Sequence, residues 1–476
     1  MTTIVDTLVI GAGPAGLIAA DRLTENGSRV LLVDAGRTHL RRTCPVDLLR
    51  SCNGCQGICN VISGFGGSIH YGDGVKLSRF PSGRRLAELL GADRAEELAD
   101  RALRRLCGEE DLPAFHGALP ALGPFTVKDY PVASLSAAHV RTLIERLHRR
   151  ITTAPGTELR MQTQVSCLQP LGQAWRAEVV GRSGSSEFVH ASSVVVAVGR
   201  RGQRWWQQTL RGLGVSFSAP APSVGVRFEA PTALLQRGSD IHEDFKTTIV
   251  TNGVKIKTFC FCAGPGGGRI KFTDYGEHTL LDGHVIPEAK RGSTANFALL
   301  AQLRASDGSP RTTAWVDENL LVPYRALRTD RPGKPVLQWY PDFRSRSLAC
   351  KELEQFARLS GFHPSLRDYQ VADLAGILPQ DIHTALCDAF EDLMAYFTGG
   401  ALPGRIASQV AVIGLELENL WDELKLTDGL ETTAPGLYAA GDCTGLAQGI
   451  LQAAVGGLAA AEAITGRPGR STGLAA

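Results

Sequence analysis

Residues 4–34 read IVDTLVIGAGPAGLIAADRLTENGSRVLLVD, and this stretch decides the fold. The apolar run at 4–10 predicts a buried strand, the glycine-rich turn after it predicts a sharp reversal, and the run that closes on Asp34 predicts a second strand. Between the strands, the sequence predicts a helix that ends near Gly27. A strand, a helix and a strand in this order form a βαβ unit, so we expect an α/β fold with a Rossmann-type sheet.

Three glycines of this stretch, Gly11, Gly13 and Gly16, have the spacing G-x-G-x-x-G between a strand and a helix. The first permits the tight turn, the second lets a pyrophosphate approach the backbone, and the third lets the helix lie against the strand. The unpaired N–H groups that begin the helix attract phosphate. Asp34 is expected to accept hydrogen bonds from the adenosine ribose, and its charge favours FAD or NAD over NADP. Neighbouring positions expected at the same site are Pro14, Ala15 and Ala35.

A glycine–aspartate turn near the end of the sequence, GLYAAGDCTG at 436–445, precedes an apolar segment that predicts a buried helix. This segment resembles the second FAD signature of flavoproteins of the glutathione-reductase type. The resemblance implies that Asp442 binds the ribityl chain and that the helix directs its positive end at the flavin pyrimidine. The segment SSVVVAVGRRG at 192–202 resembles the middle signature of the same flavoproteins. The cofactor positions that follow are Gly66, Gly67, Val165, Gly199, Gly441, Gln448, Gly449 and Ile450.

Short segments spread over most of the chain, among them GFGG at 64–67 and KTFCFCAGP at 257–265, resemble a bacterial family of FAD-dependent dehydrogenases related to the HI0933-like flavoproteins. The resemblance implies a discontinuous Rossmann-type FAD-binding domain with an inserted α+β substrate domain. It also implies hydride transfer between a small organic substrate and the flavin. Because no second fingerprint follows, NAD(P)H is expected only as a transient electron donor.

The expected segments follow changes in composition along the chain. Gly214 ends a predicted helix, and beyond it the sequence becomes strand-like and rich in glycine and proline. We expect the first part of the FAD-binding domain at 1–214, the substrate domain at 215–404, the rest of the FAD-binding domain at 405–466, and a disordered tail at 467–476.

A cysteine cluster, CNGCQGIC at 52–59, carries Cys52, Cys55 and Cys59, with Cys44 shortly upstream. Three interpretations stay open: four thiolates around a metal, a dithiol that exchanges electrons with the flavin, or thiols that simply pack. We assign the first three cysteines to catalysis and no residue to a metal. A dithiol in this place would make the protein a flavin-linked dithiol/disulfide oxidoreductase, whereas a metal clip would fit a non-catalytic FAD-binding sensor or assembly protein.

Two further side-chain groups are candidates for chemistry. His70, which follows the glycine-rich run, is a candidate acid or base. Cys260 and Cys262 alternate on one expected strand, so they lie on the same face and allow either a paired function or core packing. An oxygen-using monooxygenase is a further possibility for the flavin chemistry.

Charge and composition exclude several kinds of partner. The chain has 50 basic and 48 acidic residues and a net charge of +2, which gives no reason to expect nucleic acid. The first residues lack a signal peptide, and no apolar run is long enough to cross a bilayer. Eleven cysteines, an odd number, favour a reducing compartment. We therefore expect a cytoplasmic protein with a small-molecule substrate and no membrane partner; the sequence gives no indication of the oligomeric state.

Overall fold

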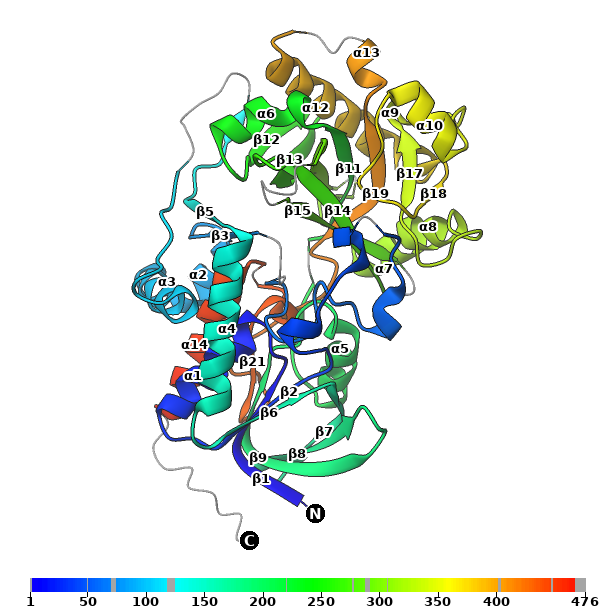
Figure 1. Ribbon diagram of the computed structural model, residues 1–476. Helices are drawn as coiled ribbons and strands as arrows, with labels where there is room; N and C mark the ends of the chain where they lie inside the picture. The colour runs from blue at the N-terminus through cyan, green and yellow to red at the C-terminus, as the bar shows by residue number, and fades with distance from the viewer. Residues whose placement is uncertain are drawn as a thin grey trace.

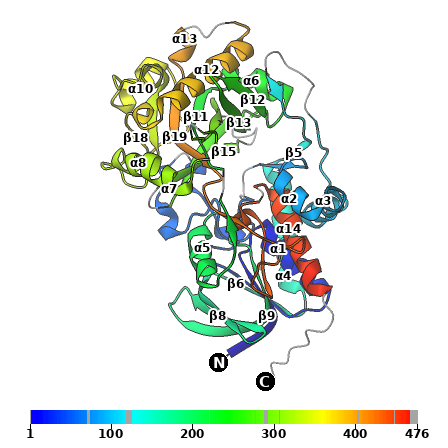
Figure 2. The same ribbon diagram turned by 180° about the vertical axis from the view of Figure 1, so that it is seen from behind.

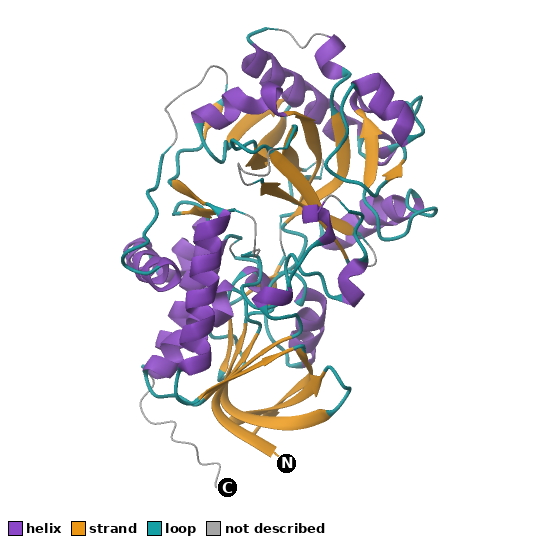
Figure 3. Cartoon of the chain, in the orientation of Figure 1, coloured by secondary structure: helices purple, strands orange, loops and turns teal. Residues whose placement is uncertain are grey.

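Two β-sheets, one toward each end of an elongated molecule, organise the computed structural model (Figure 1, Figure 3). Helices cover both sheets, and irregular segments fill the region between them. The mixed α/β class predicted from the sequence is confirmed. The structure describes residues 2–48, 50–69, 74–117, 125–219, 221–275, 278–286, 292–305, 307–400, 404–446 and 448–466.

The first sheet contains the expected βαβ unit. Its strands run in the order β6-β2-β1-β9-β8-β7, with β21 paired to β9. The pairs among β6, β2, β1, β9 and β21 are parallel, whereas β7, β8 and β9 pair antiparallel. Its strands are β1 (Thr2–Ile10), β2 (Val30–Asp34), β6 (Thr157–Met161), β7 (Thr163–Leu171), β8 (Ala174–Gly181), β9 (Ser186–Val196) and β21 (Leu437–Ala439).

Helices cover both faces of this sheet, which explains why the end of β1 (residues 7–10) and most of β2 are buried. One face carries α1 (Pro14–Glu25), α3 (Ala92–Cys107), α4 (Ala137–Thr153) and α14 (Ile450–Thr465), and the other carries α5 (Gln203–Gly212). Figure 2 shows the same arrangement from behind. Ser136 begins α4: its hydroxyl accepts a hydrogen bond from the His139 backbone N–H, and the apolar side chains spaced along the helix, Val140, Leu143, Ile144 and Leu147, are buried.

The first and last helices of the chain, α1 and α14, pack against each other. Gly457 makes the close approach possible, because a Cβ at this position would overlap the carbonyl oxygen of Ala15. The expected apolar helix at the end of the sequence is therefore confirmed as a buried one, and Gly457 lies at its contact with the helix that begins at the glycine-rich turn.

The second sheet is mostly antiparallel, in the order β18-β17-β19-β11-β16-β13-β12-β4. Helices α6 (Thr232–Ile241) and α12 (Gln380–Thr398) pack on this sheet in one apolar core. A hairpin of β14 (Gly268–Asp274) and β15 (Thr279–Val285) lies near the sheet. A second apolar core contains side chains of this hairpin, of α10 (Leu353–Ser360) and of the sheet. The strands of the second sheet are β4 (Thr126–Val127), β11 (Ser223–Pro231), β12 (Thr247–Thr251), β13 (Val254–Cys262), β16 (Thr294–Gln302), β17 (Val336–Trp339), β18 (Gln370–Val371) and β19 (Ala411–Glu418).

The chain crosses from one sheet to the other at positions that differ from the expected domain boundaries. Strand β4 comes early in the chain but pairs with β12 of the second sheet. Strand β19 follows the expected boundary at 404 yet pairs with β11 and β17, because its nearly continuous apolar side chains fill the centre of that sheet. The return to the first sheet therefore falls after Glu418. The expected tail at 467–476 lies outside the described residues.

Shorter elements connect these layers. Strands β3 (Val75–Ser78) and β5 (Val132–Leu135) form one small antiparallel pair, and β10 (Phe217–Ser218) and β20 (Glu423–Leu424) form another. The remaining helical turns are η1 (His39–Arg41), η2 (Pro45–Leu48), η3 (Gly54–Gly57), α2 (Arg84–Leu90), α7 (Thr313–Val316), the π-helical η5 (Asp317–Leu321), α8 (Val322–Ala326), α9 (Tyr340–Ser345), α11 (Leu374–Ile377), α13 (Gly404–Ala407) and η6 (Asp442–Thr444).

Candidate active site

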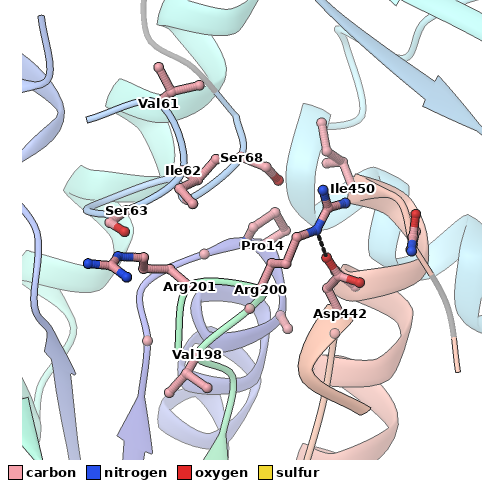
Figure 4. Close-up of a pocket in the computed structure, with 18 of the residues that line it drawn as sticks. Pro14, Val61, Ile62, Ser63, Ser68, Val198, Arg200, Arg201, Asp442 and Ile450 are labelled. Atoms are coloured by element: carbon pink, nitrogen blue, oxygen red, sulfur yellow. Dashed lines mark hydrogen bonds and ion pairs between the residues drawn. The ribbon is translucent and has the colours of Figure 1, made fainter. Parts of the chain in front are cut away.

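A cavity of about 670 Å³ lies between the two sheets. Its walls come from the turn between β1 and α1, the loop at 58–68, strand β3, the turn between β9 and α5, the ends of β13 and β15, and the start of α14. A cavity of this volume, at the junction of two layers, is of the size that binds cofactors and small molecules. Figure 4 shows part of its lining.

The glycine-rich turn forms one part of the wall. Gly11 has a φ of 110°, and Gly13 is the N-cap of α1, which begins with Pro14. Gly16 does not line the cavity; a Cβ there would overlap the carbonyl oxygen of Gly11, so this glycine lets the helix lie against the strand. The three glycines thus stand in the three structural positions expected of a pyrophosphate-binding turn.

The carboxylate of Asp34 lines the same part of the cavity. Its Oδ2 accepts a hydrogen bond from the backbone N–H of Ala12 at 2.8 Å, and its Oδ1 accepts one from Gly36 at 2.7 Å. These bonds fix the carboxylate beside the glycine-rich turn. Because each carboxylate oxygen has two acceptor sites, both keep a site for a ribose hydroxyl.

Arg42 holds the loop that forms the opposite wall. Its side chain is buried and donates hydrogen bonds to the backbone carbonyls of Asn60 at 3.0 Å, Val61 at 2.9 Å and Phe65 at 2.7 Å, and also to that of Gly67. Burial lowers the pKa of Arg42 to about 10, although the Asp34 carboxylate acts in the opposite direction. Sequence reasoning missed Arg42, because nothing in its neighbourhood distinguishes it from other arginines.

The C-terminal turn brings a second helix start to the cavity. Gly449 is the N-cap of α14, with a φ of 137°, and lines the cavity with Gln448 and Ile450. Gln452, one turn further on, donates hydrogen bonds from Nε2 to the backbone carbonyls of Ser78 at 2.8 Å and Ser82 at 3.0 Å. The helix start is therefore fixed to β3, and its positive end faces one wall of the cavity.

Asp442 lines the cavity just before this helix and forms an ion pair with Arg200. The Arg200 Nε donates to Oδ2 of Asp442 at 3.1 Å (Figure 4), and Arg200 Nη1 lies 3.8 Å from Oδ1 of Asp282. Burial opposes the charge of Arg200, but the two carboxylates outweigh this effect and raise its pKa. Arg200 immediately follows Gly199, so its ion pair with Asp442 links the middle and C-terminal signatures.

Comparison with known proteins gives one match to a family model. The model of the pyridine nucleotide-disulphide oxidoreductases matches residues 5–53, which contain the βαβ unit, Cys44 and Cys52. The cofactor of this enzyme is FAD. The residues present fit it: a glycine cradle, a carboxylate with free acceptor sites and two helix starts line one cavity. The chain is an FAD-dependent oxidoreductase.

Whole-chain comparisons are more distant. An uncharacterised protein of Clostridium beijerinckii is 23% identical over 474 residues, covering 96% of this chain and 80% of that protein. A flavoprotein/dehydrogenase from Cytophaga hutchinsonii is 13% identical, with 97% and 79% covered and a TM-score of 0.40. A geranylgeranyl bacteriochlorophyll reductase-like protein from Thermoplasma acidophilum is 12% identical, with 98% and 79% covered and a TM-score of 0.39. Similarity at this level carries no information about substrate or reaction.

The expected FAD positions fall into two groups in the structure. Gly16 and Gly66 lie outside the cavity lining, and Gly66 packs where a Cβ would lie 2.6 Å from Cδ1 of Ile144. The other expected positions line the cavity: Gly11, Gly13, Pro14, Ala15, Asp34, Ala35, Gly67, Val165, Gly199, Gly441, Asp442, Gln448, Gly449 and Ile450. His70 lies outside the described residues.

The cysteine cluster lies beside the FAD cavity but does not line it. Cys44 packs with Val46 and Val61, and burial raises its pKa to about 12. Cys55 is buried, and its burial also raises the pKa of the thiol. In the described ranges, no group of three or more His, Cys, Asp or Glu side chains could hold a metal ion. The catalytic role expected for Cys52, Cys55 and Cys59 stays a prediction, without support from the cavity.

The wall of the FAD cavity nearest the second sheet is charged; we call Lys76, Asp244, Cys260, Tyr275 and Asp282 the inner wall. Lys76 on β3 donates to Oδ1 of Asp244 at 3.2 Å. Burial alone would lower the pKa of Lys76, but the Asp244 carboxylate outweighs this effect and raises it. Sequence reasoning did not assign Lys76, because the residue that fixes it is 168 positions away.

Asp244 is the centre of a buried network in the inner wall. The Tyr130 hydroxyl donates to its Oδ2 at 2.6 Å, and the backbone N–H of Phe261 donates to its Oδ1 at 3.2 Å. Lys246 lies 3.2 Å from the same Oδ2. Burial opposes the charge of Asp244, but the two lysines outweigh it and lower the carboxyl pKa.

In the part of the chain that the structure describes, no helix is both long and apolar enough to span a bilayer.

Proposed function

We propose that this protein catalyses hydride transfer between a small organic substrate and FAD, with the substrate bound against the inner wall. The observation that carries this proposal is the convergence of ionisable side chains from β3, the turn after β9, the segment before β12 and the hairpin strand β15 on the FAD cavity. Pockets at the junction of layers with a few convergent polar groups are the usual place for such reactions. FAD supplies the two-electron chemistry, and the chain supplies orientation, charge and protons.

The charge of the inner wall supports a polar or anionic substrate. Lys76 and Lys246 both lie 3.2 Å from the carboxylate of Asp244, so two positive charges surround one negative charge. Both lysines line the cavity, where partial shielding from water makes electrostatic attraction stronger than in bulk solvent. A substrate with a carboxylate or another anionic group would be held there.

Asp282 is the residue we assign to proton transfer. It lines the cavity on β15, with its side chain about 30% exposed, and burial raises the pKa of its carboxyl although Arg200 acts in the opposite direction. A raised pKa lets a carboxyl hold a proton closer to neutral pH, which an acid–base group of an oxidoreductase must do. The ion pair of Arg200 with Asp442 leaves Asp282 the weaker partner of that arginine.

The test is anaerobic reduction of the purified, FAD-loaded protein. NADH, NADPH and a panel of small organic acids and alcohols are mixed with it in turn, and the loss of the visible absorbance of oxidised FAD is followed. We expect at least one donor to reduce the flavin. If bound FAD is reduced by dithionite but by none of the donors, the proposal is overturned in favour of a non-catalytic FAD-binding protein.

The role of Asp282 is tested with the donor that reduces the unchanged protein. Asp282→Asn should slow flavin reduction about 100-fold, the lower end of what a general acid or base contributes. The matched control is Asp274→Asn, because Asp274 is exposed on the partner strand of the same hairpin and does not line the cavity. Equal reduction rates in the two variants would remove Asp282 from the mechanism.

A further inference from the structure

Two thiols lie side by side at the end of β13. The Sγ atoms of Cys260 and Cys262 are 3.8 Å apart, and both residues line the FAD cavity. In a regular strand, residues two apart are separated by about 6.6 Å along the strand. Here Cys260 has a φ of 49°, and the pairing with β16 shifts register between Phe259 and Cys262. The bulge therefore accompanies a thiol pair that is closer than a flat strand would give.

The neighbouring strand leaves room for this pair. A Cβ built on Gly283 of β15 would lie 2.9 Å from Sγ of Cys262, a distance that real Cβ atoms do not adopt. The thiol of Cys260 approaches the Gly283 carbonyl oxygen at 3.6 Å. The pair is thus enclosed on the side of β15 by backbone rather than by an apolar side chain, which is unlike a thiol that only fills space in a core.

Two cations, the buried Arg227 and the half-buried Lys76, flank the thiols. Nη1 of Arg227 donates to the carbonyl oxygen of Cys260 at 3.3 Å, and Lys76 donates to that of Phe261. Arg227 is fully buried and pairs with Glu416 at 3.0 Å, and its Nη2 has no hydrogen-bond partner among the described residues. The positive charges of Arg227 and Lys76 favour a thiolate at this place over a neutral thiol.

The two cysteines differ in their expected protonation. The hydrogen bond from Cys262 lowers the pKa of Cys260, with help from Arg227 and Lys76 and against burial and the Asp244 charge. The same bond, together with burial, raises the pKa of Cys262. These shifts favour the thiolate at Cys260 and the thiol at Cys262. In contrast, burial raises the pKa of the isolated Cys443 to about 12.

We propose that Cys260 and Cys262 are a redox-active dithiol that exchanges an electron pair with FAD. The proposal rests on the proposed function only in that FAD must occupy this cavity. In the forward direction the Cys260 thiolate and the Cys262 thiol form an S–S bond, and the S–H bond of Cys262 breaks. Its proton and the electron pair convert FAD to the anionic reduced form FADH−, so that charge, hydrogen and electrons balance. The reverse reaction reduces the disulfide and restores the thiolate and the thiol.

The test uses a tryptic peptide that the sequence provides. Cleavage after Lys257 and Arg269 releases TFCFCAGPGGGR, residues 258–269, in which Cys260 and Cys262 are the only cysteines. After an acid quench and alkylation with N-ethylmaleimide, mass spectrometry distinguishes the dithiol, which carries two labels, from the disulfide, which carries none. The readout reports the thiols themselves and needs no substrate turnover.

Two anaerobic mixtures cover both directions of the exchange. In the first, oxidised FAD is added to the dithiothreitol-reduced, desalted protein. In the second, FAD bound to the disulfide form is photoreduced. Whichever way the potentials lie, one mixture must react, and we expect one disulfide to form or disappear for each FAD whose visible absorbance changes. If FAD binds but peptide 258–269 keeps its labelling state in both mixtures, the dithiol proposal is overturned. If FAD does not bind, the proposed function fails instead.

Matched variants separate the two cysteine groups of the chain. Cys260→Ser combined with Cys262→Ser should abolish the exchange, while FAD binding and thermal unfolding show that the fold persists. The control combines Cys52→Ser with Cys55→Ser, because these residues do not line the cavity and should leave the exchange unchanged. Loss of the exchange in the control, with persistence in the first variant, would assign the dithiol to the cluster at 52–59 and overturn the proposal.

Discussion

Gly13 and Gly67 meet backbone to backbone at the wall of the FAD cavity, since a Cβ built on Gly67 would lie 2.7 Å from the Cα of Gly13. The first residue ends the glycine-rich turn before α1, and the second belongs to the loop that Arg42 holds. The contact shows why glycine is needed at position 67, where a side chain would overlap the backbone of the glycine-rich turn; a Cβ on Gly13 would meet the Cα of Gly67 at an ordinary 3.7 Å.

Gly67→Ala should therefore weaken FAD binding at least tenfold. The matched control is Gly184→Ala: both glycines have positive φ values, 54° and 81°, but nothing lies within 4 Å of a Cβ at Gly184. Both variants should show the strain of a left-handed alanine, about 1 kcal/mol, in thermal unfolding of the FAD-free protein. Titration of FAD fluorescence measures the affinity, and equal affinities in the two variants would contradict the role of the contact.

Arg42→Lys should destabilise the fold by about 3 kcal/mol, because one ammonium cannot replace a guanidinium that binds several buried carbonyls. FAD binding should fall in parallel, since the loop at 60–69 loses its support. The free energy of unfolding in urea measures the effect. Arg41→Lys, at the neighbouring exposed position, is the control and should change that free energy by less than about 0.5 kcal/mol.

Alkylation with iodoacetamide should label Cys260 at pH 7 before the other cysteines of the reduced protein. Because the pKa of Cys260 is lowered, its thiolate persists at pH values at which an ordinary thiol is protonated. The rate of alkylation should therefore fall only when the pH drops below that lowered pKa. Lys76→Met removes a nearby positive charge and should move the rate profile to higher pH. A profile that Lys76→Met leaves unchanged would show that this charge does not act on the thiol.

Glu229 should make stability fall as the pH rises from about 5 to 7. The side chain is fully buried and accepts hydrogen bonds from the Ser365 backbone N–H at 3.0 and 3.1 Å, and burial raises its pKa from 4.5 to about 7. Between pH 4.5 and 7 the Glu229 carboxyl is ionised in the unfolded chain but still protonated in the folded protein. The unfolded state therefore binds fewer protons, and the free energy of unfolding falls as the pH rises.

Glu229→Gln should remove the contribution of this residue to the pH dependence, which corresponds to about 3 kcal/mol for a shift of this size. Urea unfolding of the unchanged protein and the variant at pH 5 and pH 7.5 gives the comparison. Glu354→Gln, on the exposed face of α10, serves as the control and should keep the pH dependence of the unchanged protein. A variant as pH-dependent as the control would contradict the assignment to Glu229.

The local parts of the fold could be predicted from the sequence. The βαβ unit, the start of α4 at Ser136 and the buried C-terminal helix each depend on residues within about 30 positions, where apolar spacing and glycine turns act directly. Strand β19 was assigned to the wrong side of the expected boundary. Its apolar run indicates a buried strand but does not indicate which of two sheets receives it.

The inner wall could not be predicted in the same way. Lys76 meets Asp244 and Phe261, which come far later in the chain, and only the three-dimensional placement of β3 beside β13 brings them together. The alternation of Cys260 and Cys262 was visible, but the bulge that accompanies their close approach was not. The more conspicuous cluster at 52–59 drew the catalytic prediction instead.

The pairing of strand β4 with the second sheet limits how this protein can be divided into fragments. Strand β4 is an early segment that completes the edge of the second sheet, while β21 and α14, the last elements, complete the first. A shortened chain ending at 214 would carry β4 without its partner and would lack one side of the flavin cradle. Neither half is a transplantable module, and chimeras should exchange surface loops rather than whole layers.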